Sequence, residues 1–104
     1  MVRHRMHLVA GLGRYRDALK WVADLNVERR RLGLSEVTAW APIQGDFNCL
    51  VLESEYADLA AFDAAQEKFS SDSQTMTVFR RGNEWGSSSH WPKDEIEVTA
   101  TQIA

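Results

Sequence analysis

The sequence has little cysteine, little proline and no long hydrophobic run. Its 104 residues contain one cysteine, Cys49, and two prolines. A single cysteine excludes an internal disulfide framework and is typical of a reducing compartment. The apolar stretch near the start is too short for a secretory signal, and no run approaches the length that a bilayer crossing needs. We therefore expect a cytoplasmic protein with no membrane partner.

The chain also lacks an excess of basic charge. It has 12 Lys and Arg against 15 Asp and Glu, a net charge of -3, so there is no electrostatic reason to expect a nucleic-acid partner. A glycine-rich phosphate-binding motif and a serine-centred nucleophile elbow are both absent from the sequence. Nucleotide use and serine hydrolysis are therefore disfavoured.

One stretch, Phe47 to Phe69, indicates how the chain is organised. Its first six residues, FNCLVL, are apolar on both faces of a strand except at Asn48. The polar residues 53–55 are expected to end this strand, and Asp58 is expected to cap the helix that follows. One stripe of that helix can lie on a sheet, and it consists of Leu59, Phe62, Gln66 and Phe69. The stretch therefore predicts a β-to-α unit.

The other segments extend this unit to the order β-α-β-β-α-β within a single domain, residues 1–104. Alternation predicts strands over 3–10 and 34–41 and from Ile96 onward, with a hairpin loop at 42–46. A helix is predicted over 14–32 and ends at Gly33, and Asp72 is expected to cap a further helical piece. The apolar stripe of the first helix is expected to be Tyr15, Ala18, Leu19, Val22 and Leu25.

This order of elements is typical of an α+β fold with a ferredoxin-like antiparallel sheet and both helices on one face. The other face of such a sheet would carry Val9, Trp40 and Ile103 together with part of the apolar third strand. That is more apolar surface than a protein usually leaves in water. We therefore expect a second copy of the chain to cover this face.

The run LVLESEYADLAAFDAAQEKFSSD, followed by a helical stretch, a loop and a short last strand, resembles the dimeric α+β barrel superfamily. The similarity is greatest to its small NIPSNAP-like and antibiotic-biosynthesis-monooxygenase-like members. It implies a homodimer in which each protomer keeps a cleft between sheet and helices. Members that act on small aromatic or polyketide-like molecules bind them there. The superfamily includes cofactor-free oxygenases, isomerases, polyketide cyclases, haem proteins and domains with no known reaction.

Two histidines are candidates for acid–base catalysis. His90 stands beside Trp91 in the loop before the last strand, where it could exchange a proton with a phenol or enol. His4 is in phase with Met6, so it is either a pocket acid or base or a hydrogen-bonded residue of the strand. His4 and His7 are three apart on a strand and point to opposite faces, so no metal site is expected.

Several aromatic and polar residues are candidates for ligand binding. Each also has a structural explanation, such as core packing, dimer packing, loop anchoring or a local hydrogen bond in the sheet. The candidates are Asn48, Tyr56, Trp85, Trp91 and Trp40.

Other reactive residue types favour structural roles. Cys49 has no basic neighbour in the sequence that would activate its thiol, so a buried, inert cysteine is favoured. Arg29, Arg30 and Arg31 fall in the last turn of a helix, where cations complement the helix dipole. We interpret them as a solvated helix end rather than an anion site.

Two functions from different classes follow. The first is a small cofactor-independent enzyme that oxygenates, isomerises or cyclises an aromatic or polyketide-like molecule. The second is a non-catalytic dimeric module that binds a small molecule or a partner chain in the same cleft. Haem with a histidine ligand is a weaker third alternative.

Overall fold

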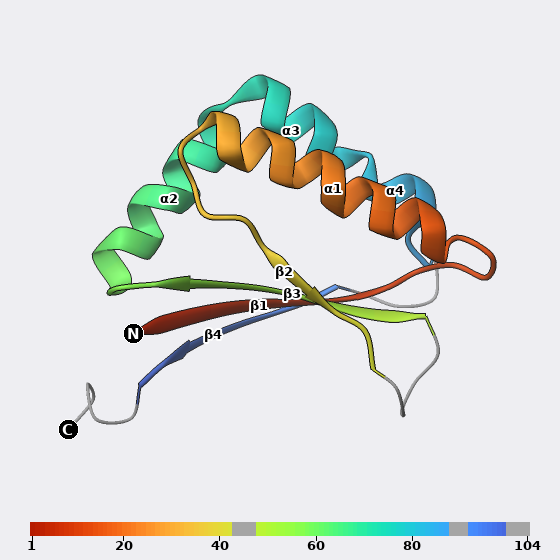
Figure 1. Ribbon diagram of the computed structural model, residues 1–104, viewed down its shortest axis with the longest axis horizontal. Helices are drawn as coiled ribbons and strands as arrows, with labels where there is room; N and C mark the ends of the chain where they lie inside the picture. The colour runs from red at the N-terminus through yellow and green to blue at the C-terminus, as the bar shows by residue number, and fades with distance from the viewer. Residues whose placement is uncertain (43–47, 88–91, 100–104) are drawn as a thin grey trace.

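The computed structural model describes residues 1–42, 48–87 and 92–99, and its strands form one antiparallel sheet. The sheet order is β2-β3-β1-β4, the ferredoxin-like arrangement. All helices lie on one face of it (Figure 1). The elements in chain order are β1 Val2–Val9, α1 Tyr15–Arg31, β2 Thr38–Trp40, β3 Cys49–Tyr56, α2 Leu59–Ser71, α3 Ser73–Arg80, α4 Gly82–Trp85 and β4 Lys93–Val98. The predicted fold class is confirmed.

Helix α1 buries a slightly different stripe from the one that the sequence predicts. Ala18, Val22 and Leu25 are buried as expected, but Leu19 is 44% exposed and Trp21 is 5% exposed. The spacing 18, 21, 22, 25 follows one face of a helix, and Leu19 lies off it. Gly33, with a φ of +75°, follows the helix end as predicted.

Strand β3 is longer than the sequence predicts, because residues 53–55 continue it instead of ending it. Glu53 is opposite Arg5 of β1 and Glu55 is opposite Arg3, on the face away from the helices. Glu53 lies 3.5 Å from Arg3 and 3.6 Å from Arg5. The acidic side chains therefore have cross-strand cations and a polar face to occupy, which lets the strand run on to Tyr56.

The two predicted helix caps are confirmed. Asp58 Oδ1 accepts a hydrogen bond from the Ala61 amide at 2.8 Å. Asp72 Oδ2 accepts from the Thr75 hydroxyl at 2.7 Å and from the Thr75 amide at 2.9 Å, and it also pairs with Arg31. These bonds, those from Thr75 first, lower the pKa of Asp72 to about 2. Arg31 also pairs with Glu28 at 2.7 Å, so the end of α1 is tied to the start of α3.

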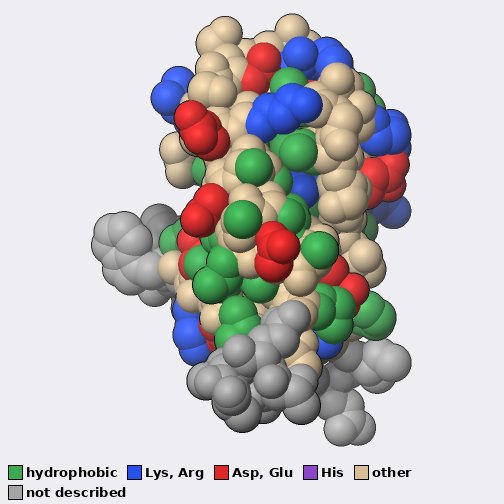
Figure 2. Space-filling model, turned by 90° about the vertical axis from the view of Figure 1, so that its left-hand side faces the viewer, with side chains coloured by type: hydrophobic (Ala, Val, Ile, Leu, Met, Phe, Trp, Pro, Cys, Tyr) green, Lys and Arg blue, Asp and Glu red, His purple; other side chains and the backbone are tan. Residues whose placement is uncertain are grey.

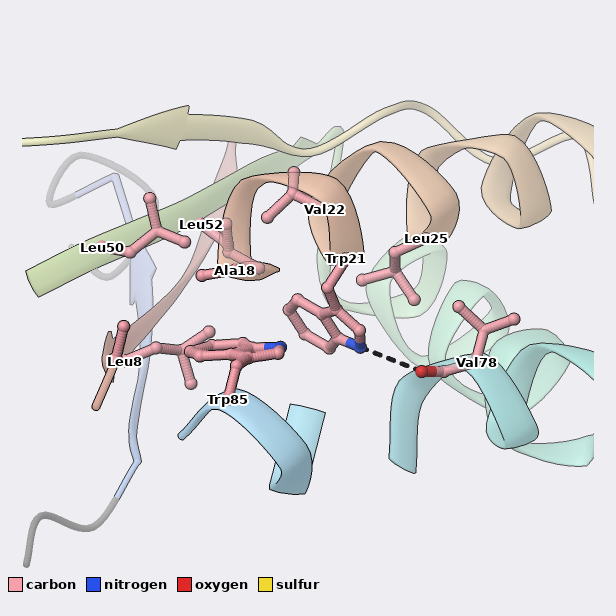
Figure 3. Close-up of a cluster of buried hydrophobic side chains, with 10 residues drawn as sticks. Leu8, Ala18, Trp21, Val22, Leu25, Leu50, Leu52, Val78 and Trp85 are labelled. Atoms are coloured by element: carbon pink, nitrogen blue, oxygen red, sulfur yellow. Dashed lines mark hydrogen bonds between the residues drawn. The ribbon is translucent and has the colours of Figure 1, made fainter. Parts of the chain in front are cut away.

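The core lies between the sheet and α1, with α3 and α4 closing it (Figure 3). Trp21 Nε1 donates to the Val78 carbonyl at 2.9 Å, and the rings of Trp21 and Trp85 are 5.2 Å apart. Leu50 of β3 is 1% exposed and Leu52 is 4% exposed. This packing fixes α3 and α4 against α1 and thereby sets the space left above β1 and β4.

The sheet face away from the helices is divided into two halves. One half carries the charged rows formed by Arg3, Arg5, Glu53, Glu55, Glu95 and Glu97. The other half is mostly apolar, with Trp40 opposite Val51 and Val9 opposite Cys49, and His7 lies between Val51 and Lys93 at its border. Trp40 is 55% exposed. Ile103, also expected on this face, lies outside the described residues.

The end of the molecule where α2 begins is also partly apolar. Figure 2, which views this end, shows hydrophobic side chains exposed between the helices and the strands, with acidic side chains among them. Elements at this end contribute three large apolar side chains that are about half exposed: Met1, Leu59 and Ile96. Leu59 was expected on the buried stripe of α2, but it is the first residue of the helix and is 53% exposed.

Candidate functional site

A cleft of about 500 Å³ lies between the sheet and the helices. Its floor comes from Met6 and Leu8 of β1, and aromatic side chains of α1, α3 and α4 form its wall. Those aromatic side chains are Trp21, Phe79 and Trp85. A mostly apolar concave site with a few polar groups is the usual form of a small-molecule site.

Backbone hydrogen bonds hold α4 in place at one end of this cleft. The Gly11 amide donates to the Trp85 carbonyl at 2.8 Å, and the Ser87 amide donates to the Val9 carbonyl at 2.8 Å. Gly82 lies so close to Trp21 that an added Cβ would stand 3.4 Å from the indole ring. The short helix is therefore fixed to the end of β1 and seats Trp85 against Trp21.

Trp85 has an indole nitrogen that is buried without a hydrogen-bond partner among the described residues. In Figure 3 this nitrogen lies on the side of the ring that faces Trp21. The two rings are inclined at 59°. The Trp21 ring packs beside this N–H group, and an aromatic face can act as a weak acceptor.

Asp94 of β4 lines the cleft, and its carboxylate is hydrogen-bonded to His4 of β1. His4 Nε2 lies 3.0 Å from Asp94 Oδ1. The His4 side chain is 13% exposed, with its ring edge-on to Phe62 at 5.4 Å, whereas the Asp94 side chain is 62% exposed. In this pair the histidine is largely buried and the carboxylate is accessible to solvent.

The sequence prediction missed Asp94, although a signal for it was present. Ile96 and Val98 alternate along the last strand, and the same phase two residues earlier falls on Asp94. The register sets Asp94 opposite Met6 and Ile96 opposite His4, so this phase faces the helices. Extending the alternation backward would have placed this carboxylate on the helix-facing side of the sheet.

Arg80 and Asn83 provide the polar groups on the helix side of the cleft. Arg80 is the last residue of α3 and is exposed. Within the part of the chain that the structure describes, it forms no ion pair with a carboxylate. The cleft thus has a cation on its helix side and an anion, Asp94, on its sheet side.

The predicted ligand-binding residues do not all meet at this cleft. Trp85 lines it. Trp40 does not, because its strand position puts it on the opposite face of the sheet. Asn48 precedes β3 instead of lying in it. Its φ is +61°, a conformation that Asn tolerates better than most residues, and its carbonyl accepts from the Ala10 amide at 2.9 Å.

Tyr56 lies at the other end of β3, where it contacts Arg29, one of the three arginines at the end of α1. Arg29 is 5% exposed and donates to the Tyr56 hydroxyl at 3.1 Å and to the Ser35 carbonyl at 2.7 Å. Tyr56 is the last residue of the strand and not part of the turn after it. The interpretation of the cluster as a solvated helix end is therefore wrong for Arg29, which ties α1 to β3.

The remaining predicted site residues are histidines and the tryptophan beside one of them. His90 and Trp91 lie outside the described residues, between Ser87 and Pro92, which both line the cleft. His7 lies on the open sheet face, 3.1 Å from Glu95. Of the two described histidines, neither lines the cleft, so they do not fit an axial haem ligand there.

The described residues form neither a metal site nor a membrane-spanning helix. Over residues 1–42, 48–87 and 92–99, no group of three or more His, Cys, Asp and Glu side chains is placed to hold a metal ion. Over the same residues, every helix is too short or too polar to span a bilayer.

The fold and cleft define the class: a small α+β domain of ferredoxin-like topology with a small-molecule-sized cleft. Its solved structural relatives include an uncharacterised NIPSNAP domain protein from Burkholderia xenovorans, with a TM-score of 0.78 and 19% identity over 96% of this chain and 95% of that one. A NIPSNAP family protein from Agrobacterium tumefaciens matches with a TM-score of 0.75 and 15% identity over 95% and 85% of the two chains.

A second group of structural relatives carries an enzyme name. An antibiotic biosynthesis monooxygenase matches with a TM-score of 0.71 and 14% identity over 96% of this chain and 99% of that one. No protein-family model matches the chain, and no curated protein matches it. At these identities the likeness establishes the fold, and it confirms the expected NIPSNAP-like and monooxygenase-like architecture.

Proposed function

We propose that the protein binds a flat aromatic or polyketide-like molecule in this cleft and acts on it without a bound cofactor. The observation that carries the proposal is the Asp94–His4 pair at the edge of an aromatic-lined cleft. Tryptophan and phenylalanine faces suit flat ring systems. Oxygenation, isomerisation and cyclisation of such molecules can each begin with removal of a proton from a hydroxyl or an acidic carbon.

Asp94 is the group that would take this proton. When His4 donates through Nε2, it engages Asp94 Oδ1 only. Oδ2 has no hydrogen-bond partner among the described residues, and the Asp94 side chain is 62% exposed. His4 acts as a positioning residue, because its packing against Phe62 fixes the carboxylate that it holds. His90 remains a second candidate base.

Anthrone is a suitable probe of this chemistry. It is a flat tricyclic ketone with an acidic C–H group, and with dioxygen it gives anthraquinone and water, which absorbance and oxygen consumption both report. Asp94→Asn should slow turnover about a hundredfold, the usual size of a general-base effect. Asp63→Asn, an exposed carboxylate on α2, is the matched control.

The variants separate the two candidate bases. Full activity in Asp94→Asn with loss in His90→Ala would move the role to His90. Full activity in both variants would contradict acid–base catalysis by either residue. His4→Gln keeps a hydrogen-bond donor and should therefore retain more activity than His4→Ala.

A second candidate function is a non-catalytic binding module. Among the described residues that line the cleft, the ionisable ones are Arg80 and Asp94. A binding site needs no more than this. Probe binding without turnover by the wild-type protein would favour the module over the enzyme.

We also propose a homodimer formed through the open sheet face. The apolar half of that face, with Trp40, Val51 and Val9, is the supporting observation. Trp40→Lys should shift the mass measured by sedimentation from dimer to monomer. Leu12→Lys, at a 92% exposed residue in the turn after β1, should leave the mass unchanged. A wild-type monomer at micromolar concentration would contradict the proposal.

The cytoplasm remains the proposed compartment. Cys49 is a free thiol and is partly exposed on the open face. A reducing environment keeps such a thiol from oxidation. Localisation of a tagged chain in its own cell would test this.

A further inference from the structure

We infer that the ligand of the cleft is an aromatic acid that also carries a hydroxyl group, with its anionic group bound by Arg80 and its hydroxyl by Asp94. The inference rests on the proposed function, because it concerns the same cleft. It adds the polar groups of the ligand and their places. The inference is argued from the two charged side chains that line the cleft, Arg80 and Asp94.

Arg80 is one of four arginines without a carboxylate partner among the described residues, together with Arg16, Arg29 and Arg81, and it is the one of the four that lines the cleft. Arg3 and Arg5 lie near Glu53, Arg14 pairs with Asp17, Arg30 with Glu36 and Arg31 with Glu28 and Asp72. Arg80 has no carboxylate partner among the described residues, and it is the arginine that lines the cleft. Its guanidinium group is therefore available to a ligand.

Arg80 and Asp94 line one cleft and yet form no ion pair with each other. The Arg80 nitrogens therefore lie more than 4.0 Å from the Asp94 carboxylate oxygens, so a gap separates the two groups. Arg80 belongs to the helix layer and Asp94 to the sheet, so they line the cleft from its two layers. A ligand that spans the gap can satisfy both groups, with a ring system stacked between its two polar ends.

The chemistry of the two groups sets the polarity of the ligand. A guanidinium group has only donors and suits a carboxylate or enolate, which it can bind in bidentate fashion. An ionised carboxylate has only acceptors and suits a hydroxyl. A purely apolar ligand would shield both charges from water without pairing them, which is costly. A hydroxylated aromatic acid meets both requirements.

Three probes separate these contributions by isothermal titration calorimetry at neutral pH. Naphthoate carries the anion only, naphthol carries the hydroxyl only, and hydroxynaphthoate carries both. Arg80→Gln should weaken naphthoate binding about tenfold and leave naphthol binding unchanged, as expected for loss of one charge-assisted contact. Asp94→Asn should weaken naphthol binding, and it should not weaken naphthoate binding.

Arg81→Gln is the matched control. Arg81 is the next residue, is also exposed, and lines a different groove between α1 and α3. Its variant should bind all three probes as the wild type does. Circular dichroism of each variant establishes that it is folded.

The outcomes distinguish the inference from the function on which it rests. Binding of naphthol and naphthoate with equal affinity, unaffected by Arg80→Gln, would overturn the inference and leave the aromatic cleft in place. An equal loss in Arg80→Gln and Arg81→Gln would show a general charge effect and would also overturn it. Failure of all three probes to bind the wild type would overturn both.

Discussion

Two neighbouring tryptophans allow a matched test of the packing that forms the cleft. Trp21 and Trp85 are 5% and 4% exposed. Trp21 Nε1 donates to the Val78 carbonyl at 2.9 Å, whereas Trp85 Nε1 has no hydrogen-bond partner among the described residues. Substitution by Phe removes the same atoms from each. The two variants therefore differ chiefly by one hydrogen bond.

We expect Trp21→Phe to lower the free energy of unfolding more than Trp85→Phe does. The difference should be about 0.5–1.5 kcal/mol, the net contribution of one such bond. The lower part of this range is favoured, because the Val78 carbonyl keeps a second donor, the Arg81 amide at 3.1 Å. For a chain of this size, each 1 kcal/mol corresponds to about 4–8 °C in Tm.

Urea unfolding followed by far-ultraviolet circular dichroism measures this difference without depending on tryptophan fluorescence. Equal slopes for the two variants would show that the change is in stability and not in the unfolded state. An equal loss in both variants, or a larger loss in Trp85→Phe, would refute the reasoning. It would mean that the Trp85 N–H group has a partner as effective as a carbonyl.

Three further changes test other parts of the fold. Asp58→Ala should lower stability by about 1 kcal/mol in a thermal melt, because the Ala61 amide loses its cap, whereas Asp58→Asn should stay near the wild type. Leu50→Ala, at a 1% exposed residue, should cost about 2–5 kcal/mol in urea, and a smaller loss would mean that the core closes over the gap. The folded-state pKa of Asp72 is about 2, below its ordinary value of 3.8, so its stabilising contribution is present above 3.8 and is lost as the pH falls toward 2. Asp72→Asn should make the urea midpoint less dependent on pH in that window, and an unchanged dependence would assign it to other carboxyl groups.

Local signals in the sequence were sufficient for the order of elements and for the helix ends. Asp58, Asp72 and Gly33 act within a few residues of their own position, so capping and turn preferences identify them. Hydrophobic periodicity likewise reports on one element at a time. The ferredoxin-like arrangement follows from the order of those elements.

The parts that were missed depend on which segments become neighbours. The polar residues 53–55 predict a strand end in the sequence alone. In the sheet they continue the strand, because Arg3 and Arg5 lie opposite their acidic side chains. Trp40 was a candidate for the cleft wall from the sequence alone, but the strand register places it beside Val51 on the open face. Asp94 and Arg80 meet at one cleft only through tertiary packing. Such features require strand register and helix position, which periodicity does not supply.

The most direct test of the central claim, that the cleft is the ligand site, is a titration followed by the indole N–H signals in nuclear magnetic resonance. Naphthoate and naphthol serve as ligands, and Trp→Phe variants assign the signals. Shifts at Trp21 and Trp85, with Trp40 on the open face unchanged, are the predicted result. Shifts confined to Trp40, or no shift at either cleft tryptophan when binding is saturated, would contradict it.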